Sequence, residues 1–249
     1  MKNQFFGDEN DYKKFSLLRL LTQFGKLKVT VCWMLTDNNF RSDGRHTEYL
    51  LEPKVWRPFD PAIFDLLRDS VITKSMRDVN LFEKSNLLPT AAFYSERLPE
   101  NRADRSQYFK TLMEFAHGSD LIFFDPDNGI EVKSTPYGKK GYSKYLYWKE
   151  LVPFFQAGHS LLIYQHFPRS RRDMYIRNLS AEIEFRTGAT HIYCFYTSRV
   201  LFVLIPQARH DKDLAEGVGR LKTQWGSVMK LFTDKHKFDE QTSLGICHK

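Results

Sequence analysis

Short apolar runs recur along the chain and alternate with longer amphipathic stretches. Each apolar run has the length and composition of a buried strand. The predicted strands cover residues 28–35, 79–83, 90–94, 120–124, 160–165, 191–196 and 199–205. The stretches between them repeat apolar residues at helical spacing, which predicts helices over residues 12–24, 61–70, 105–116, 147–156, 173–185 and 213–232. Asp11 is expected to cap the first of these helices and Gly25 to end it.

The order of these elements predicts the fold class. Strands separated by helices form a mostly parallel sheet with helices on both faces. The last two strands are joined by the short turn at Thr197 and Ser198, so they form an antiparallel hairpin. The sequence therefore predicts an α/β fold, a Rossmann-like doubly wound sheet with a C-terminal antiparallel hairpin. We expect one domain over residues 1–232 and a polar C-terminal tail over residues 233–249, because no repeat or Gly/Ser linker divides the chain.

The strand at 120–124 ends in the turn Asp125-Pro126-Asp127-Asn128-Gly129. Proline cannot donate to a strand ladder and glycine favours a turn, so the strand stops there. Parallel sheets bind ligands at the carboxyl ends of their strands, which makes these carboxylates candidate site residues. Gln165 and His166 end the next predicted strand, so they should line the same crevice. The alternative is that Asp125 and Asn128 only cap the turn.

Composition narrows the classes of protein to consider. The formal charge of +7 and pI near 9.2 favour a polyanionic partner, with nucleic acid as the first candidate. The three cysteines lie far apart and predict neither a disulfide framework nor a zinc site, and we expect no metal centre. No apolar run reaches the length of a membrane span, so we expect a cytoplasmic protein without a membrane partner. The oligomeric state stays open.

Two short motifs resemble those of class I S-adenosylmethionine-dependent methyltransferases. Asp125-Pro126-Asp127-Asn128 resembles their acidic or amide residue followed by Pro-Pro and an aromatic, with Asp127 and Asn128 replacing the last two. Asp11-x-x-Lys14-x-x-Leu17-Leu18 resembles the opening of ribosomal-RNA adenine methyltransferases and of three-Cys-motif partner proteins. The loop after the first strand, Thr36-Asp37-Asn38-Asn39-Phe40, departs from the glycine-rich loop of these enzymes.

The resemblance implies S-adenosylmethionine as cofactor and methylation of an amino group on a nucleic-acid base. Acceptors at the turn would hold the target nitrogen, and a carboxylate would take its proton. The implied catalytic residues are Asp125, Pro126, Asp127, Asn128, Gln165 and His166. The expected cofactor contacts are Lys14, Asp37, Asn38 and Glu83, of which Glu83 would bind ribose hydroxyls. The expected nucleic-acid contacts are Lys139, Lys140, Lys144, Arg169, Arg171 and Arg172.

Two alternatives remain. The first is a catalytically degenerate methyltransferase fold that binds nucleic acid or protein. The second is a magnesium-dependent nuclease, because Pro126-Asp127 and Glu131-Val132-Lys133 spell the PD-(D/E)xK pattern. Asn128-Gly129 would have to reverse the chain within that short spacing.

Overall fold

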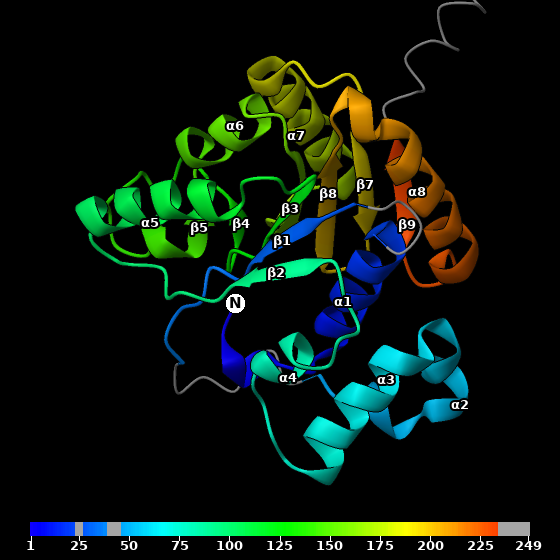
Figure 1. Cartoon of the computed structure of the whole chain (residues 1–249). Helices are drawn as coiled ribbons and strands as arrows, with labels where there is room; N and C mark the ends of the chain where they lie inside the picture. Colours follow the sequence, from blue (N-terminus) through cyan, green and yellow to red (C-terminus); the bar gives the residue numbers. More distant parts are fainter. Residues whose placement is uncertain (23–26, 39–45, 234–249) are drawn as a thin grey trace, which may run out of the picture.

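A seven-stranded, mostly parallel sheet with helices on both faces forms the centre of the molecule (Figure 1). The computed structural model describes residues 1–22, 27–38 and 46–233. Gly25, residues 39–45 of the loop after the first strand, Cys247 and the predicted tail from residue 234 lie outside the described residues. Within the described residues, no helix is both long and apolar enough to cross a membrane.

The sheet has the strand order β2-β1-β3-β6-β8-β7-β9. Its strands are β1 Val29–Cys32, β2 Ala91–Tyr94, β3 Leu121–Phe124, β6 Ser160–His166, β7 Tyr193–Tyr196, β8 Val200–Ile205 and β9 Lys230–Thr233. A separate two-stranded sheet consists of β4 Gly129–Ile130 and β5 Tyr145–Leu146. The first four strands in the order run parallel to one another. β8 is antiparallel to both β6 and β7, and β9 extends the edge by pairing antiparallel with β7.

Two layers of helices bury the two faces of this sheet. The α-helices are α1 Glu9–Thr22, α2 Pro53–Trp56, α3 Pro61–Arg68, α4 Asn80–Glu83, α5 Arg102–Phe115, α6 Trp148–Gln156, α7 Arg172–Thr187 and α8 Asp211–Trp225. One apolar core joins α1, α3 and α8 to the sheet through residues such as Val31 and Phe123. The other joins α5, α6 and α7 to the opposite face through Cys32 and Phe124 (Figure 1). Successive strand residues therefore enter different cores, as the alternation of a strand requires.

Three element predictions differ from the structure. Residues 80–83 form the short helix α4 rather than a strand, because a brief apolar run fits either state. The last helix ends at Trp225 and gives way to β9, so residues 230–233 belong to the sheet and not to a helix or a tail. The first helix begins at Glu9, and its cap is Asp8 rather than Asp11. Asp8 Oδ1 accepts hydrogen bonds from the backbone N–H groups of Asn10 (2.8 Å) and Asp11 (2.9 Å).

The strand order places a ligand crevice between β1 and β3. The connection from β1 leads to β2 on one side, whereas β3 lies on the other, so the winding of the sheet reverses there. Open α/β sheets bind ligands outside the carboxyl ends of the strands at such a reversal. Asp125 follows β3 directly and lies at this edge.

Candidate functional site

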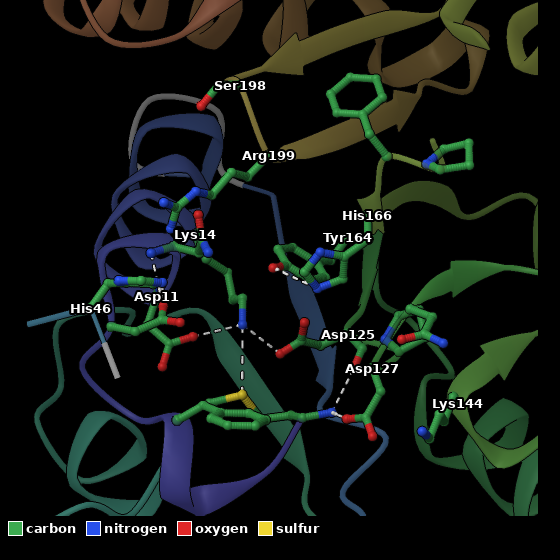
Figure 2. Close-up of a pocket in the computed structure, with 18 of the residues that line it drawn as sticks. Asp11, Lys14, His46, Asp125, Asp127, Lys144, Tyr164, His166, Ser198 and Arg199 are labelled. Carbon is green, nitrogen blue, oxygen red and sulfur yellow. Dashed lines mark hydrogen bonds and ion pairs between the residues drawn. The ribbon is translucent and has the colours of Figure 1, made fainter. Parts of the chain in front are cut away.

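A cleft of about 1040 Å³ opens at the carboxyl edge of the sheet (Figure 2). The segments that line it are far apart in sequence: the N-terminal segment and the start of α1, the turn after β3, the end of β6 with the loop to α7, and the β7–β8 turn. These segments meet because β3, β6 and β7 all direct their carboxyl ends to this edge. The cleft therefore lies where the strand-end carboxylates were expected to gather.

Lys14 lies at the centre of the floor of the cleft, between two carboxylates (Figure 2). Its Nζ is 2.8 Å from Asp11 Oδ1 and 2.6 Å from Asp125 Oδ2, and all three side chains are almost completely buried. The ammonium also lies 4.9 Å from the centroid of the Tyr164 ring. Helix spacing brings Asp11 and Lys14 to one face of α1, and this pair ties the helix to the end of β3.

The ionisation states of Lys14, Asp11 and Asp125 depend on one another. Burial alone would lower the pKa of Lys14, but Asp11 and Asp125 outweigh it and raise the pKa. Lys14 is therefore a cation at neutral pH. Asp125 Oδ1 accepts no hydrogen bond from the described residues, so one acceptor of this carboxylate is available at the floor of the cleft.

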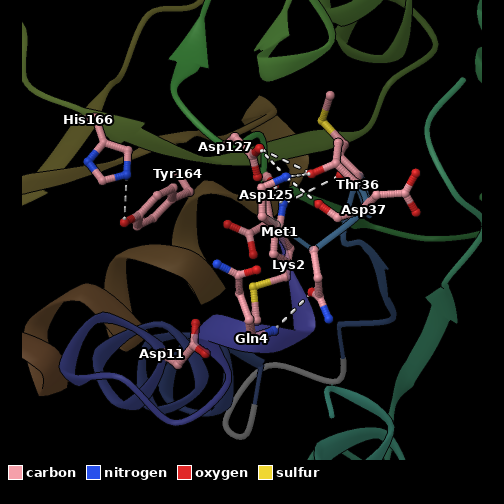
Figure 3. A network of polar contacts seen from close by, with 12 residues as sticks. Met1, Lys2, Gln4, Asp11, Thr36, Asp37, Asp125, Asp127, Tyr164 and His166 are labelled. Carbon is pink, nitrogen blue, oxygen red and sulfur yellow. Dashed lines mark hydrogen bonds and ion pairs between the residues drawn. The ribbon is translucent and has the colours of Figure 1, made fainter. Parts of the chain in front are cut away.

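Asp127 is held by the N-terminal segment (Figure 3). Its Oδ1 is 3.1 Å from the Met1 α-ammonium, and its Oδ2 is 3.1 Å from Lys2 Nζ. The Thr36 hydroxyl donates a third hydrogen bond to Oδ2. Burial would raise the pKa of Asp127, but the two ammonium groups lower it to about 2. The carboxylate is therefore ionised, and both of its oxygens are bound.

Asp8 contributes a different kind of carboxyl to the cleft. Burial and the neighbouring Asp11 raise the pKa of Asp8 to about 8. At neutral pH Asp8 is mostly protonated and adds little negative charge.

Gln165 lies beneath the lining of the cleft and holds the backbone of Asn128, which is part of that lining. The Gln165 amide donates to the carbonyl oxygens of Asn128 (3.2 Å) and His166 (2.7 Å) and accepts from the Ile130 N–H (2.7 Å). Gln165 is buried and lies outside the lining of the cleft, whereas Asn128 is part of the lining. Gly129 makes this contact possible: its φ of +114° suits glycine, and a Cβ there would lie only 2.2 Å from Gln165 Oε1.

His166 lies at the mouth of the cleft. Its Nε2 is 3.2 Å from the Tyr164 hydroxyl, and the two rings meet edge-on at 5.1 Å. Partial burial of the ring lowers the pKa of His166, so the imidazole is neutral at pH 7. A neutral imidazole can donate or accept a hydrogen bond.

Basic residues form the rim of the cleft. We define the rim as Lys144, Arg169, Arg171, Arg172 and Arg199, all of them exposed. Four of these were expected nucleic-acid contacts, and the structure brings them together. The other two, Lys139 and Lys140, are exposed on the preceding turn and do not line the cleft.

The expected cofactor contacts do not share a cavity. Lys14 lines the cleft, whereas Asp37 and Asn38 line a separate cavity of about 270 Å³. Glu83 lies on α4 and accepts hydrogen bonds from the Trp33 indole (2.7 Å) and the Ser95 hydroxyl (2.5 Å). Lys2, which binds Thr36 and the Asp37 carbonyl, lies at the carboxyl end of β1. The four expected cofactor contacts are therefore not brought together in one cavity.

The nuclease pattern is not assembled either. Glu131 accepts a hydrogen bond from the Trp148 N–H at the start of α6, and Lys133 is exposed. β4 pairs parallel with β5 in a separate two-stranded sheet, so Asn128-Gly129 does not return the chain along β3. Among the described residues, no group of three His, Cys, Asp or Glu is arranged to hold a metal ion.

Some lining residues had no sequence signal that marked them. Arg199 lies in the turn between β7 and β8, His46 follows a polar loop, and Asp8 precedes the first helix. They reach the cleft only through tertiary folding. The basic net charge of the chain is a sequence signal that includes Arg199, but it does not distinguish this residue from the other lysines and arginines.

No model of a protein family matches the chain, and no curated protein matches it. Among solved structures, the chain is similar to the protein LPL1258 of Legionella pneumophila, of the DUF519 family. The TM-score is 0.46 at 11% identity, and the match covers 92% of this chain and 96% of the other. The class that the structure itself defines is an α/β protein with a mostly parallel sheet and a cleft at its carboxyl edge.

Proposed function

We propose that this protein binds nucleic acid and that the cleft receives an unpaired nucleotide. The observation that carries the proposal is the rim: five cations from three separate segments of the chain surround one cleft of about 1040 Å³. Phosphate recognition by Lys and Arg supplies most of the affinity of proteins for nucleic acid.

The balance of charge within the cleft supports an anionic ligand. On the floor, the carboxylates of Asp11, Asp125 and Asp127 face three ammonium groups, those of Lys14, Lys2 and Met1. The floor is therefore close to neutral. On the rim, the one ion pair within the described residues joins Arg171 to Asp173, with both side chains well exposed. An exposed pair of this kind exchanges readily for a phosphate.

Aromatic side chains between these cations suit an unpaired base. Phe167 lines the cleft and is flanked by the Arg172 guanidinium at 5.7 Å and by the Tyr175 ring at 5.8 Å. Bases of single strands stack on such rings, and arginine adds to the stack.

The test is a salt titration of binding to fluorescent single-stranded oligonucleotides, followed by anisotropy. Replacing Arg169, Arg171 and Arg199 together by Ala should weaken binding and make the slope of log K against log salt shallower by about 2. The matched control replaces the exposed Lys54, Lys110 and Lys212, which do not line the cleft, and should leave the slope nearly unchanged. Equal losses in both triple variants would refute the proposal.

Methylation of an amino group is a second proposal for the same cleft. Its support is the place of Asp125 after β3 and its available Oδ1, which could accept a hydrogen bond from an amine. Because the expected cofactor contacts lie apart from one another, we assign no reaction step. Calorimetric titration with S-adenosylmethionine tests this proposal, and the absence of both heat and thermal shift would refute it.

A further inference from the structure

A second cavity continues the cleft beyond Arg199. It has a volume of about 280 Å³ and shares Asn10, His46, Ser198 and Arg199 with the cleft. Figure 2 shows Ser198, Arg199 and His46 on the side of the cleft away from Lys144. The two cavities thus adjoin along a common wall. This arrangement suits an extended ligand that occupies both cavities.

The far end of the second cavity presents an aromatic ring. Trp56 lines it and is partly exposed. Two neighbours hold the indole, Tyr49 at 5.7 Å edge-on and Phe59 at 6.0 Å. The Lys13 ammonium lies 5.7 Å from its centroid. A fixed aromatic ring beside a cation is a platform on which any base can stack.

Arg199 stands between the two cavities as an available cation. Its side chain is exposed and makes no hydrogen bond or ion pair with the described residues. The β7–β8 turn fixes its backbone, because the Thr197 hydroxyl accepts from the Arg199 N–H (3.1 Å) and the Arg199 carbonyl accepts from Phe167. A phosphate bridging a nucleotide in the cleft and one in the second cavity would lie beside this guanidinium.

We infer that the second cavity is a binding site for a further nucleotide of the same single strand, with its base on Trp56 and its linking phosphate on Arg199. This inference rests on the proposed function of the cleft. The volume of about 280 Å³ is just below the range of about 300–1,000 Å³ for drug-sized ligands, which suits a single base. A duplex would keep its bases paired and away from Trp56.

The experiment measures affinity as a function of oligonucleotide length. Oligodeoxyadenylates and oligoadenylates of two to eight nucleotides are titrated against the full chain, and the comparison of the two series separates DNA from RNA as ligand. We expect a step of about tenfold or more in affinity between short and longer strands, in line with about 1–3 kcal/mol per stacked base. Trp56→Ala should abolish the step, and Arg199→Ala should reduce it.

Two controls separate binding from folding. Trp56→Phe keeps an aromatic ring and should retain most of the step. Arg186→Ala removes an exposed arginine that lines neither cavity and should leave the step intact. A step of equal size in wild type and Trp56→Ala, or equal affinity at all lengths, would overturn the inference while the cleft still binds. Absence of binding at every length would instead refute the proposed function as well.

Discussion

Lys14 is the single residue on which the floor of the cleft depends most. Removing its ammonium would leave Asp11 and Asp125 facing each other inside the protein without a counter-ion. We expect Lys14→Met to lower the free energy of unfolding by about 3–5 kcal/mol, as measured by urea denaturation at pH 7. The matched variant Lys74→Met breaks an exposed pair with Asp69 and should cost less than about 1 kcal/mol. Similar losses in both variants would show that the buried pairs are not what stabilises this region.

Asp8 predicts a dependence of stability on pH. Its pKa is 3.8 in ordinary surroundings and about 8 in the folded protein, so the folded state binds its proton more tightly than the unfolded state. This contribution to stability is full below pH 4 and is lost as the pH rises toward 8. Asn at this position keeps the cap oxygen but does not titrate.

Asp8→Asn should therefore gain stability relative to wild type as the pH rises from 5 to 8. Urea denaturation at a series of pH values measures this difference. A constant difference between the two proteins would mean that Asp8 is ionised throughout.

Among the elements, the turn after β3 is the most constrained. Gly129→Ala would add both an unfavourable φ and a clash with Gln165. Gly118 also has a positive φ, but a Cβ there meets nothing within 4 Å, so Gly118→Ala measures the backbone cost alone, about 1–2 kcal/mol. We expect Gly129→Ala to be the more destabilising of the two in urea denaturation. If Gln165 is the cause, the extra cost should shrink when Gly129→Ala is made in a Gln165→Ala background.

The sequence predicts elements well where burial and periodicity agree. β3 and β6 are continuous apolar runs and lie side by side as expected. The strand predicted over residues 79–83 was wrong because Leu81 and Phe82 fit a helix as well as a strand. Only their packing against the first core selects the helix. β9 was missed because Lys230 and Thr233 give this edge strand little apolar pattern.

The site was predictable only in part, because several residues that contact one another there lie far apart in the sequence. Asp125 and His166 follow buried strands, so the sheet itself brings them to one edge. The ammonium groups that bind Asp125 and Asp127 are those of Lys14, Lys2 and Met1, more than a hundred residues away. No local pattern encodes such a pairing, because it forms only when α1 and the N-terminal segment dock on the sheet.

For the molecule as a whole, we expect one cooperative unfolding transition. The two apolar cores share the same seven-stranded sheet, so neither can be lost without exposing the other. Trp225 belongs to the first core and Trp148 to the second. Tryptophan fluorescence and far-UV circular dichroism of the unaltered chain should therefore report the same urea midpoint. Different midpoints would indicate two independently folding units and contradict the prediction of one domain.

The anchoring of Met1 and Lys2 on Asp127 also has a consequence for the order in which the protein folds. The two ammonium groups and the carboxylate that binds them are separated along the chain by β1, β2 and β3. Closing so long a loop carries an entropic cost that local contacts do not. Completion of the floor of the cleft is thus a late event in folding, which follows the entry of β3 into the sheet.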